Sequence, residues 1–219
     1  MAEGRLVIGT KMYSSWSLRG WLAVRLAGLD VTEVVIPLAG GATEALKQAT
    51  PTGLVPYLEH RGCRVWESLA IVEYCAELAP ALWPADRVAR AQARSIAAEM
   101  HAGFRDLRMA MPMSILNHFP GQGRTPGALA DIARIEAIWR EALLESGGPF
   151  LFGERFGAAD AMFAPVACRF LTWEPELSEA SRAYVQAVRN HPLMRRWYDD
   201  AAAEPAAWRL AKYEGAASA

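Results

Sequence analysis

Cysteine is scarce in this sequence, and long hydrophobic runs are missing. Cys63, Cys75 and Cys168 are an odd number at wide spacings and form no CxxC pair, which argues against a disulfide framework and against dithiol redox chemistry. No stretch reaches the about 18 apolar residues that a membrane-spanning helix needs. The beginning, MAEGRLVIGTKMYSS, has no apolar core of signal-peptide length. We therefore expect a cytoplasmic protein with no membrane partner.

An excess of charge of one sign is also lacking, since the formal net charge is −1. Nucleic-acid-binding domains normally carry a basic face, so this balance gives no support for a nucleic-acid partner. The four histidines, at 60, 101, 118 and 191, form neither an HExxH motif nor a Cys/His cluster with zinc spacing. We expect no metal site. Hydrophobic residues make up 53% of the chain, enough for a packed core without metals or disulfides.

The first part of the chain alternates short apolar runs with helical patterns, which predicts an α/β domain at 1–79. A strand–helix–strand unit of these lengths predicts parallel strands joined by a right-handed crossover. Two later strands are separated only by Arg61 and Gly62, which indicates an antiparallel hairpin. The expected elements are strand 5–8, helix 17–29, strand 31–36, helix 43–48, strands 56–60 and 63–66, and helix 68–77. The order is βαβ, then α, then ββα.

A stretch with two prolines and no periodicity indicates a linker at 80–87, and the pattern beyond it, in 88–219, is helical. Ile96, Met100, Phe104, Leu107 and Met111 are spaced by four, four, three and four residues, which predicts one face of one long helix. Further helices are expected at 128–144, 159–171, 178–189 and 193–203.

Three serines, Ser14, Ser15 and Ser17, lie between the first predicted strand and the first predicted helix. Ligands of open α/β sheets bind outside the carboxyl ends of the strands, and a helix N-terminus there attracts an anion. Serine is a poor base at pH 7, so its useful role is to donate a hydrogen bond to an anion such as a thiolate. Spacing alone favours the alternative that Ser15 or Ser17 only caps the helix.

Two further loops fall at the same end of the predicted sheet. Only roughly 5% of X–Pro bonds in folded proteins are cis, so spacing favours a trans bond at Val55–Pro56. A cis bond would leave the Val55 backbone free to pair with an extended peptide. Ser68 is a natural N-cap, and a helix start there is also able to receive a carboxylate, with Glu67 beside it to pair with an ammonium. Together the three loops suit a peptide-like ligand with a carboxylate, an ammonium and a thiol, which is the chemistry of glutathione.

Four segments, in order and at matching spacing, resemble the glutathione S-transferase family. They are SSWSLR at 14–19, TPTGLVPYLE at 50–59, WESLAIVEYCAE at 66–77 and GERFGAADAMFAP at 153–165. The SSxSxR pattern resembles the serine-type, zeta-like group, which includes maleylacetoacetate isomerases. The resemblance implies a thioredoxin-like glutathione-binding domain followed by an all-helical bundle domain. It also implies glutathione as co-substrate and a homodimer.

The resemblance also implies roles for the residues of two loops. Ser14 is implied to donate to the glutathione sulfur, with Ser15 and Ser17 nearby. Val55 is implied to pair with the cysteinyl backbone, followed by a cis Pro56. These roles come from the resemblance and not from the spacing of the residues.

The resemblance implies roles for the start of another predicted helix, and the sequence departs from the family pattern at two positions, Leu54 in the implied glutathione site and Gly157 at a helix cap. Glu67 and Ser68 are implied to hold the γ-glutamyl end. Leu54 belongs to the same site, but relatives often carry Lys or Gln there to reach the glycyl carboxylate, so one contact is weakened or relocated. Gly157 stands at a helix cap where relatives have Ser or Thr, although glycine is an acceptable cap, and Asp160 is expected near that helix N-terminus.

The electrophile pocket is expected to involve Phe104, Arg108 and Met111 of the helical half, with burial in the core as the alternative for the apolar members. Zeta-like isomerases place a substrate-binding arginine where this chain has Thr172, while Arg169 lies one turn away. Three functions therefore follow from the sequence. They are a transferase joining glutathione to a small hydrophobic electrophile, a glutathione-dependent maleylacetoacetate-type cis–trans isomerase, and a non-catalytic glutathione- or ligand-binding dimer.

Overall fold

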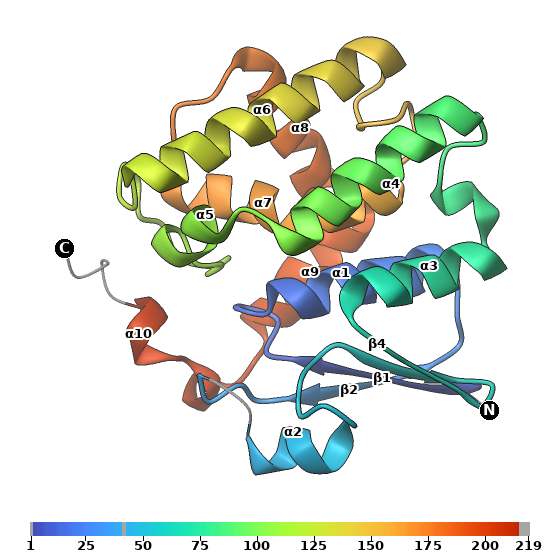
Figure 1. Cartoon of the computed structure of the whole chain (residues 1–219). Coiled ribbons are helices and arrows are strands. Elements are labelled where there is room, and N and C mark those ends of the chain that lie inside the picture. The colour runs from blue at the N-terminus through green and yellow to red at the C-terminus, as the bar shows by residue number, and fades with distance from the viewer. Residues whose placement is uncertain (1, 41–42, 215–219) are drawn as a thin grey trace.

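The computed structural model describes residues 2–40 and 43–214, and Figure 1 shows a sheet with flanking helices below a layer of longer helices. The strands are β1 (Gly4–Gly9), β2 (Thr32–Ile36), β3 (Tyr57–His60) and β4 (Cys63–Trp66). The helices are α1 (Ser15–Leu26), α2 (Glu44–Ala49), α3 (Ser68–Leu78), α4 (Arg87–Ala102), α5 (Arg105–Ala110), α6 (Pro126–Ser146), α7 (Ala158–Trp173), α8 (Glu179–Asn190), α9 (Pro192–Ala202) and α10 (Ala211–Glu214), with short 3-10 turns at Pro80–Leu82 and Ala206–Trp208.

The sheet has the strand order β2-β1-β3-β4. Strands β1 and β2 are parallel, with Val7 opposite Val34, whereas β3 is antiparallel to β1 and forms a hairpin with β4. Helices α1 and α3 cover one face and α2 lies on the other (Figure 1). The predicted βαβ–α–ββα order and the helical second half are therefore confirmed. The boundaries 1–79, 80–87 and 88–219 remain predictions, and 215–219 lie outside the described residues.

The long helix predicted through Met111 is wrong, because α4 ends at Ala102 and α5 begins at Arg105. Between them the chain is extended at Gly103, and Phe104 has a left-handed φ of 59°. Glycine favours a break because it loses more backbone freedom in a helix than other residues. The apolar side chains of the predicted stripe are all buried nonetheless, so the periodicity identified core residues across a helix break that it did not reveal.

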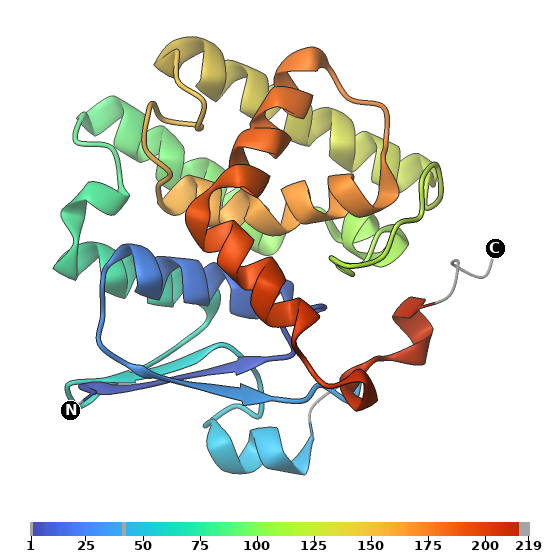
Figure 2. The ribbon, with the colours of Figure 1, turned by 180° about the vertical axis from the view of Figure 1, so that it is seen from behind.

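Helix α1 joins the two halves of the molecule. It packs against α3, which lies with it between the sheet and the helical layer (Figure 1), and against α7 of the helical layer, and one apolar core runs through both halves. The buried Arg19 Nε donates to the Met162 carbonyl at 2.9 Å, and the rings of Trp21 and Trp197 meet with centroids 5.3 Å apart. Figure 2 shows α9 crossing in front of α1 toward the sheet. The middle of α1 is thereby held by contacts with α7 and α9.

The start of α7 explains why glycine is tolerated at position 157. The Asp160 carboxylate accepts from the backbone N–H groups of Gly157 at 2.9 Å and Leu151 at 3.0 Å, and from the Tyr184 hydroxyl at 3.0 Å. Burial raises the pKa of Asp160 to about 6, against the effect of these three donors. The side chain of Asp160 therefore satisfies the backbone N–H of the capping residue itself, a contact that needs no side chain at position 157.

We expect Asp160→Ala to lower the free energy of unfolding by about 3 kcal/mol or more, because it leaves several buried donors without an acceptor. Urea denaturation followed by circular dichroism measures the change. The control is Asp86→Ala, which removes the exposed N-cap of α4 and is expected to cost about 1 kcal/mol. Equal losses in the two variants would contradict a buried capping role for Asp160.

Candidate functional site

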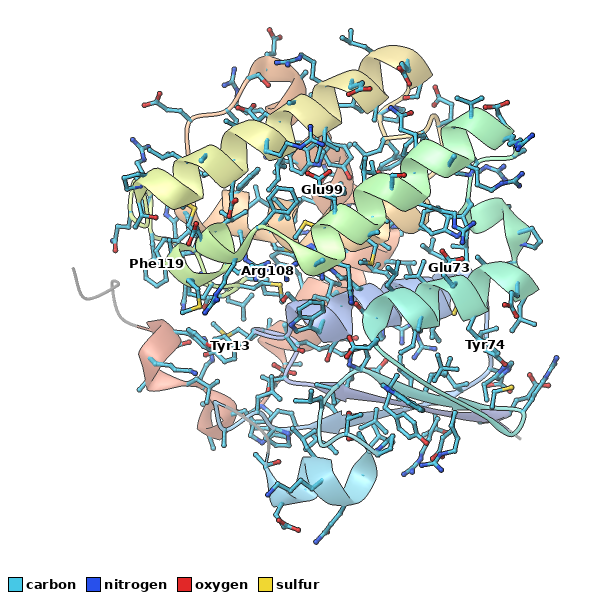
Figure 3. The ribbon with its side chains drawn as sticks, in the orientation of Figure 1. Tyr13, Glu73, Tyr74, Glu99, Arg108 and Phe119 are labelled. Atoms are coloured by element: carbon cyan, nitrogen blue, oxygen red, sulfur yellow. The ribbon has the colours of Figure 1, made fainter. Side chains whose placement is uncertain are left out.

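A cavity of about 300 Å³ opens where the carboxyl end of β1 meets the helical layer. Its walls come from the loop before α1, the segment after β2, the turn before β3, the helices α5 and α7, and the C-terminal segment. The lining residues used below are Ser14, Ser15, Val55, Arg108, Arg169 and Tyr213. Figure 3 labels Tyr13 beside α10 and Arg108 above it, on the side of the molecule where this cavity lies. The two predicted loops with Ser14 and Val55 thus meet at one cavity.

Ser14 is the N-cap of α1, which begins two residues earlier than predicted. The Ser14 Oγ accepts from the Ser17 N–H at 3.3 Å and donates to the Ser17 Oγ at 2.7 Å. The Ser17 Oγ in turn accepts from the Gly9 N–H at 2.9 Å. Ser17 is completely buried and does not line the cavity, so it supports Ser14 from behind.

Ser15 is the first residue of α1 and lines the cavity beside Ser14. Its Oγ is 3.5 Å from the Arg169 Nη2, so the hydroxyl accepts a long hydrogen bond from a guanidinium. Two serines therefore face the cavity from the positive end of a helix of 12 residues. An anionic atom placed between them is stabilised by the helix N-terminus and by hydroxyl donors.

The Val55–Pro56 peptide bond is cis, as the family resemblance implied and contrary to the trans bond that spacing favoured. Val55 lines the first cavity and also a second hollow of about 240 Å³, which includes Leu54, Trp66 and Glu67 in its wall. Within the described part of the chain, neither the N–H nor the C=O of Val55 has a hydrogen-bond partner. A peptide lying across both spaces would find these two groups free to pair.

The start of α3 differs from the sequence prediction. Ser68 was expected as the N-cap, but Glu67 takes that position with a φ of 66°, and Ser68 is the first helical residue. Glu67 makes no capping hydrogen bond, because its backbone conformation turns the side chain away; its carboxylate lies 3.7 Å from the His101 Nε2. The Ser68 Oγ is buried and has no hydrogen-bond partner among the described residues. The first turn of α3 keeps the unpaired backbone N–H groups of a helix start for an external carboxylate, whereas the fully buried Ser68 side chain is not part of the wall of the cavity or of the hollow.

Arg108 and Arg169 line the inner end of the cavity, and Arg19 lies fully buried outside its wall. The guanidinium carbons of Arg19 and Arg108 each lie 4.8 Å from the Trp16 ring centroid, and Arg169 approaches from α7. Arg108 donates to the carbonyls of Gly103 and Met100 at the end of α4. No carboxylate of residues 2–40 or 43–214 forms an ion pair with any of the three arginines.

Burial lowers the pKa of all three arginines; neighbouring arginines lower the pKa of Arg19 and Arg169 further, whereas the charge of Asp131 raises that of Arg108. Burial lowers the pKa of Arg19, with further lowering by Arg108 and Arg169. Burial, followed by the charge of Arg108, lowers the pKa of Arg169 to about 10. A guanidinium with a pKa of about 10 is still charged at neutral pH. The inner end of the cavity is therefore positively charged and suited to an anionic ligand.

The structure places only one of the three predicted electrophile-pocket residues in the cavity wall. Arg108 lines the cavity, whereas Phe104 and Met111 are buried in the core and are not part of its wall. The turn at Phe104 rotates this part of the stripe inward. Residues that sequence reasoning did not place at the site include Tyr13, Trp16, Leu38, Gly40, Leu46, Pro112, Met113, Leu210 and Tyr213. Nothing in the sequence predicts that Leu210 and Tyr213 lie at the site, because they are almost 200 residues from Ser14 in the chain.

Among the described residues, no group of three or more His, Cys, Asp or Glu side chains lies close enough together to hold a metal ion. Within the same residues, no helix has the length and apolar character needed to cross a membrane.

Two family models match the chain. The glutathione S-transferase N-terminal domain matches residues 13–78, and the glutathione S-transferase C-terminal domain matches residues 87–200. The chain therefore belongs to the glutathione S-transferase family. The enzyme class expected from the sequence is confirmed: it is a glutathione transferase.

Relatives and solved structures agree with this family. Maleylacetoacetate isomerase of Rattus norvegicus is 29% identical over 184 residues, covering 81% of this chain and 84% of the rat protein. Glutathione transferase GST 23 of Zea mays is 29% identical over 197 residues, covering 87% of this chain and 83% of the maize protein. A glutathione transferase homolog from Burkholderia with bound glutathione has a TM-score of 0.70 and 21% identity, covering 92% of this chain and 99% of that one.

We expect Ser17→Ala to lower the free energy of unfolding by about 1–3 kcal/mol, because the buried Gly9 N–H loses its acceptor. Chemical denaturation measures this change. Ser95→Ala is the control, since the exposed Ser95 hydroxyl only donates to the Ala91 carbonyl of its own helix. If both variants unfold at the wild-type denaturant concentration, Ser17 does not support the loop before α1.

Proposed function

We propose that glutathione lies across the cavity and the adjoining hollow, with its thiol at Ser14. The cysteinyl backbone pairs with the free N–H and C=O of Val55. The γ-glutamyl end reaches the start of α3, where Glu67 pairs with the ammonium and the backbone N–H groups of the first turn, that of Ser68 among them, meet the carboxylate. Support comes from the position of Val55 in the wall of both spaces and from the unpaired backbone N–H groups at the start of α3.

The observation that carries this proposal is the hydroxyl pair at the start of α1. Hydroxyl hydrogens rotate freely, so the 2.7 Å contact between Ser14 and Ser17 can be made with either oxygen as donor. With a sulfur anion in the cavity, the Ser17 hydroxyl donates to Ser14 and the Ser14 hydroxyl donates to the sulfur. The Gly9 N–H still donates to Ser17, so a chain of three donors points at the anion.

The energies are sufficient for a hydroxyl to activate the thiol without a base. A free thiol has a pKa of about 8.5, and lowering it by about two units takes about 2.7 kcal/mol of preferential thiolate stabilisation. One hydrogen bond to a charged group contributes about 1.5–3 kcal/mol, and a helix N-terminus adds about 0.3–1 kcal/mol. Ser14 and α1 together therefore supply the shift, and the thiolate attacks a small electrophile in the cavity.

We expect Ser14→Ala to lower kcat for conjugation of an aryl halide by about tenfold to a hundredfold at pH 6.5, because it removes the hydrogen bond to the thiolate. The dissociation constant for glutathione changes little, since the backbone contacts remain. In the variant the rate rises with pH toward the pKa of a free thiol, whereas the wild type is already level above pH 7.

Ser15→Ala is the matched comparison, because Ser15 faces the same cavity from the next position. It is expected to retain most of the wild-type rate at pH 6.5. A Ser14→Ala variant with normal turnover, together with an inactive Ser15→Ala variant, would transfer the role to Ser15. Loss of glutathione affinity in both would contradict the proposed placement of the peptide.

The three arginines favour a second function, the glutathione-dependent isomerisation of an unsaturated diacid such as maleylacetoacetate. Thr172, which stands at the expected arginine position, is buried and donates to the Ser114 and Cys168 carbonyls. Arg169 lines the cavity instead and faces Ser15. A substrate carboxylate would replace the water around Arg169 and Arg108. The thiolate then adds to the activated double bond, the resulting single bond rotates, and expulsion of the thiolate forms the trans isomer.

We expect Arg169→Gln to raise KM for maleylacetoacetate by about tenfold or more and to change KM for a neutral aryl halide by less than about threefold. Arg105→Gln is the control, because Arg105 is an exposed arginine of α5 outside the cavity wall. Steady-state kinetics on both substrates gives the comparison. Equal increases for the two substrates would show that Arg169 maintains the cavity and does not recognise a carboxylate.

The proposed assembly is a homodimer in the cytoplasm, as the family resemblance implies. A non-catalytic dimer that only binds glutathione or another ligand is the remaining candidate. Retention on immobilised glutathione, followed by a panel of aryl halides, epoxides and unsaturated diacids, distinguishes them. A protein that is retained and eluted by free glutathione, yet converts none of these substrates, would be a binding protein.

A further inference from the structure

The proposed glutathione position leaves the glycyl carboxylate in an apolar part of the cavity. The peptide runs from the hollow beside Glu67 past Val55, so its glycyl end falls on the opposite side of Val55. The apolar part of the cavity wall that comes from the segment after β2, from α2 and from the turn before β3 consists of Leu38, Leu46 and Leu54, of which Leu54 also lines the hollow. A carboxylate against three leucines loses hydration and finds no opposite charge among them.

Lys212 of the C-terminal segment is exposed and lies beside this part of the wall without being one of its residues. Its Nζ donates to the Gly40 carbonyl at 3.4 Å, and Gly40 itself lines the cavity. A Cβ atom at Gly40 would lie 3.2 Å from that Nζ, so the absence of a side chain at position 40 leaves room for the ammonium. No carboxylate of residues 2–40 or 43–214 forms an ion pair with Lys212. The ammonium thus has a charge that nothing in the described protein neutralises.

Other contacts hold the C-terminal segment against the cavity. The Tyr13 hydroxyl donates to the Glu214 carboxylate and accepts from the Leu210 N–H at 3.1 Å. The Asn117 amide donates to the Tyr213 carbonyl at 3.1 Å, and the rings of Tyr13 and Tyr213 lie 5.3 Å apart. Figures 1 and 2 show α10 standing at the edge of the molecule beside the segment after β2. The position of Lys212 therefore follows from contacts with residues next to Ser14.

We propose that Lys212 binds the glycyl carboxylate of glutathione, so that the C-terminal segment 209–214 completes the glutathione site. The inference rests on the proposed function, which places the peptide. Lys212 replaces the cation that Leu54 does not provide. Its counterpart on α2, Lys47, differs from Lys212 in that its ammonium pairs with Glu44 at 3.8 Å, and neither lysine is itself part of the cavity wall.

Calorimetric titration of the full chain with three thiols tests the assignment. We expect Lys212→Gln to weaken glutathione binding by about two- to fivefold at low salt, the size of a solvent-accessible ion pair, and Lys212→Arg to restore most of the affinity. Binding of γ-glutamylcysteine, which has no glycine, should be equal in the wild type and Lys212→Gln. The glycyl ethyl ester of glutathione should bind both proteins equally and more weakly than glutathione binds the wild type.

Lys47→Gln is the matched control and is expected to bind all three thiols like the wild type. Unchanged glutathione affinity in Lys212→Gln would overturn the assignment, as would an equal loss for glutathione and for its ester. A wild-type protein that binds none of the three thiols would instead contradict the proposed function itself. A glutathione affinity that falls in Lys47→Gln and not in Lys212→Gln would move the role to α2.

Discussion

The site depends on one packing constraint, the position of α1 between the sheet and the helical layer. Gly20 lies where α1 crosses Pro56, and a Cβ atom there would come within 2.8 Å of the proline Cγ. The absence of a side chain lets α1 rest on the turn before β3. This close contact brings the N-cap Ser14 and the backbone of Val55 to the same cavity. Because α7 holds the other side of α1 through the Arg19–Met162 hydrogen bond, the N-terminus has little freedom to move.

The charge of the cavity follows from the same arrangement. Burying guanidinium groups without carboxylates is costly, and the structure offsets the cost only in part, through backbone carbonyls and the Trp16 ring. Arg19 keeps two nitrogens and Arg169 one without a partner in the described protein. A core selected for stability alone would not need this cluster. The unbalanced charge has a function only if an anion enters the cavity, which is why substrate chemistry and helix packing have to be considered together.

The residue types of the short loops make part of the site predictable from the sequence. The remaining site residues come from distant parts of the chain and are not predictable in this way. Ser14, Val55 and Glu67 stand beside strands and turns whose patterns are visible within a few residues, so the sequence predicts that their loops lie at one end of the sheet. The periodicity through Phe104 identified buried residues but not the break, because hydrophobic spacing continues across Gly103 while the backbone does not. The sequence predicts Ser68 as the N-cap of α3, but Glu67 is the N-cap. The sequence does not reveal this because residue types do not show that Glu67 has a positive φ. Leu210 and Tyr213 reach the cavity only through tertiary contacts.

The division of the site between the two ends of the chain has a consequence for specificity. The loops before α1 and β3 present mainly backbone groups and small hydroxyls, which suit a ligand of constant structure. The other walls are side chains of α5, of the segment after it, of α7 and of the C-terminal segment, which include arginines, a methionine and a tyrosine. Substitutions in α5 and in the segment after it change the space for a second ligand without disturbing the sheet. Since Tyr13 touches both Tyr213 and Glu214 and precedes Ser14, the two walls are linked at the residue next to the proposed thiol donor. A change in the C-terminal segment therefore acts on the reacting end of the cavity as well as on its entrance.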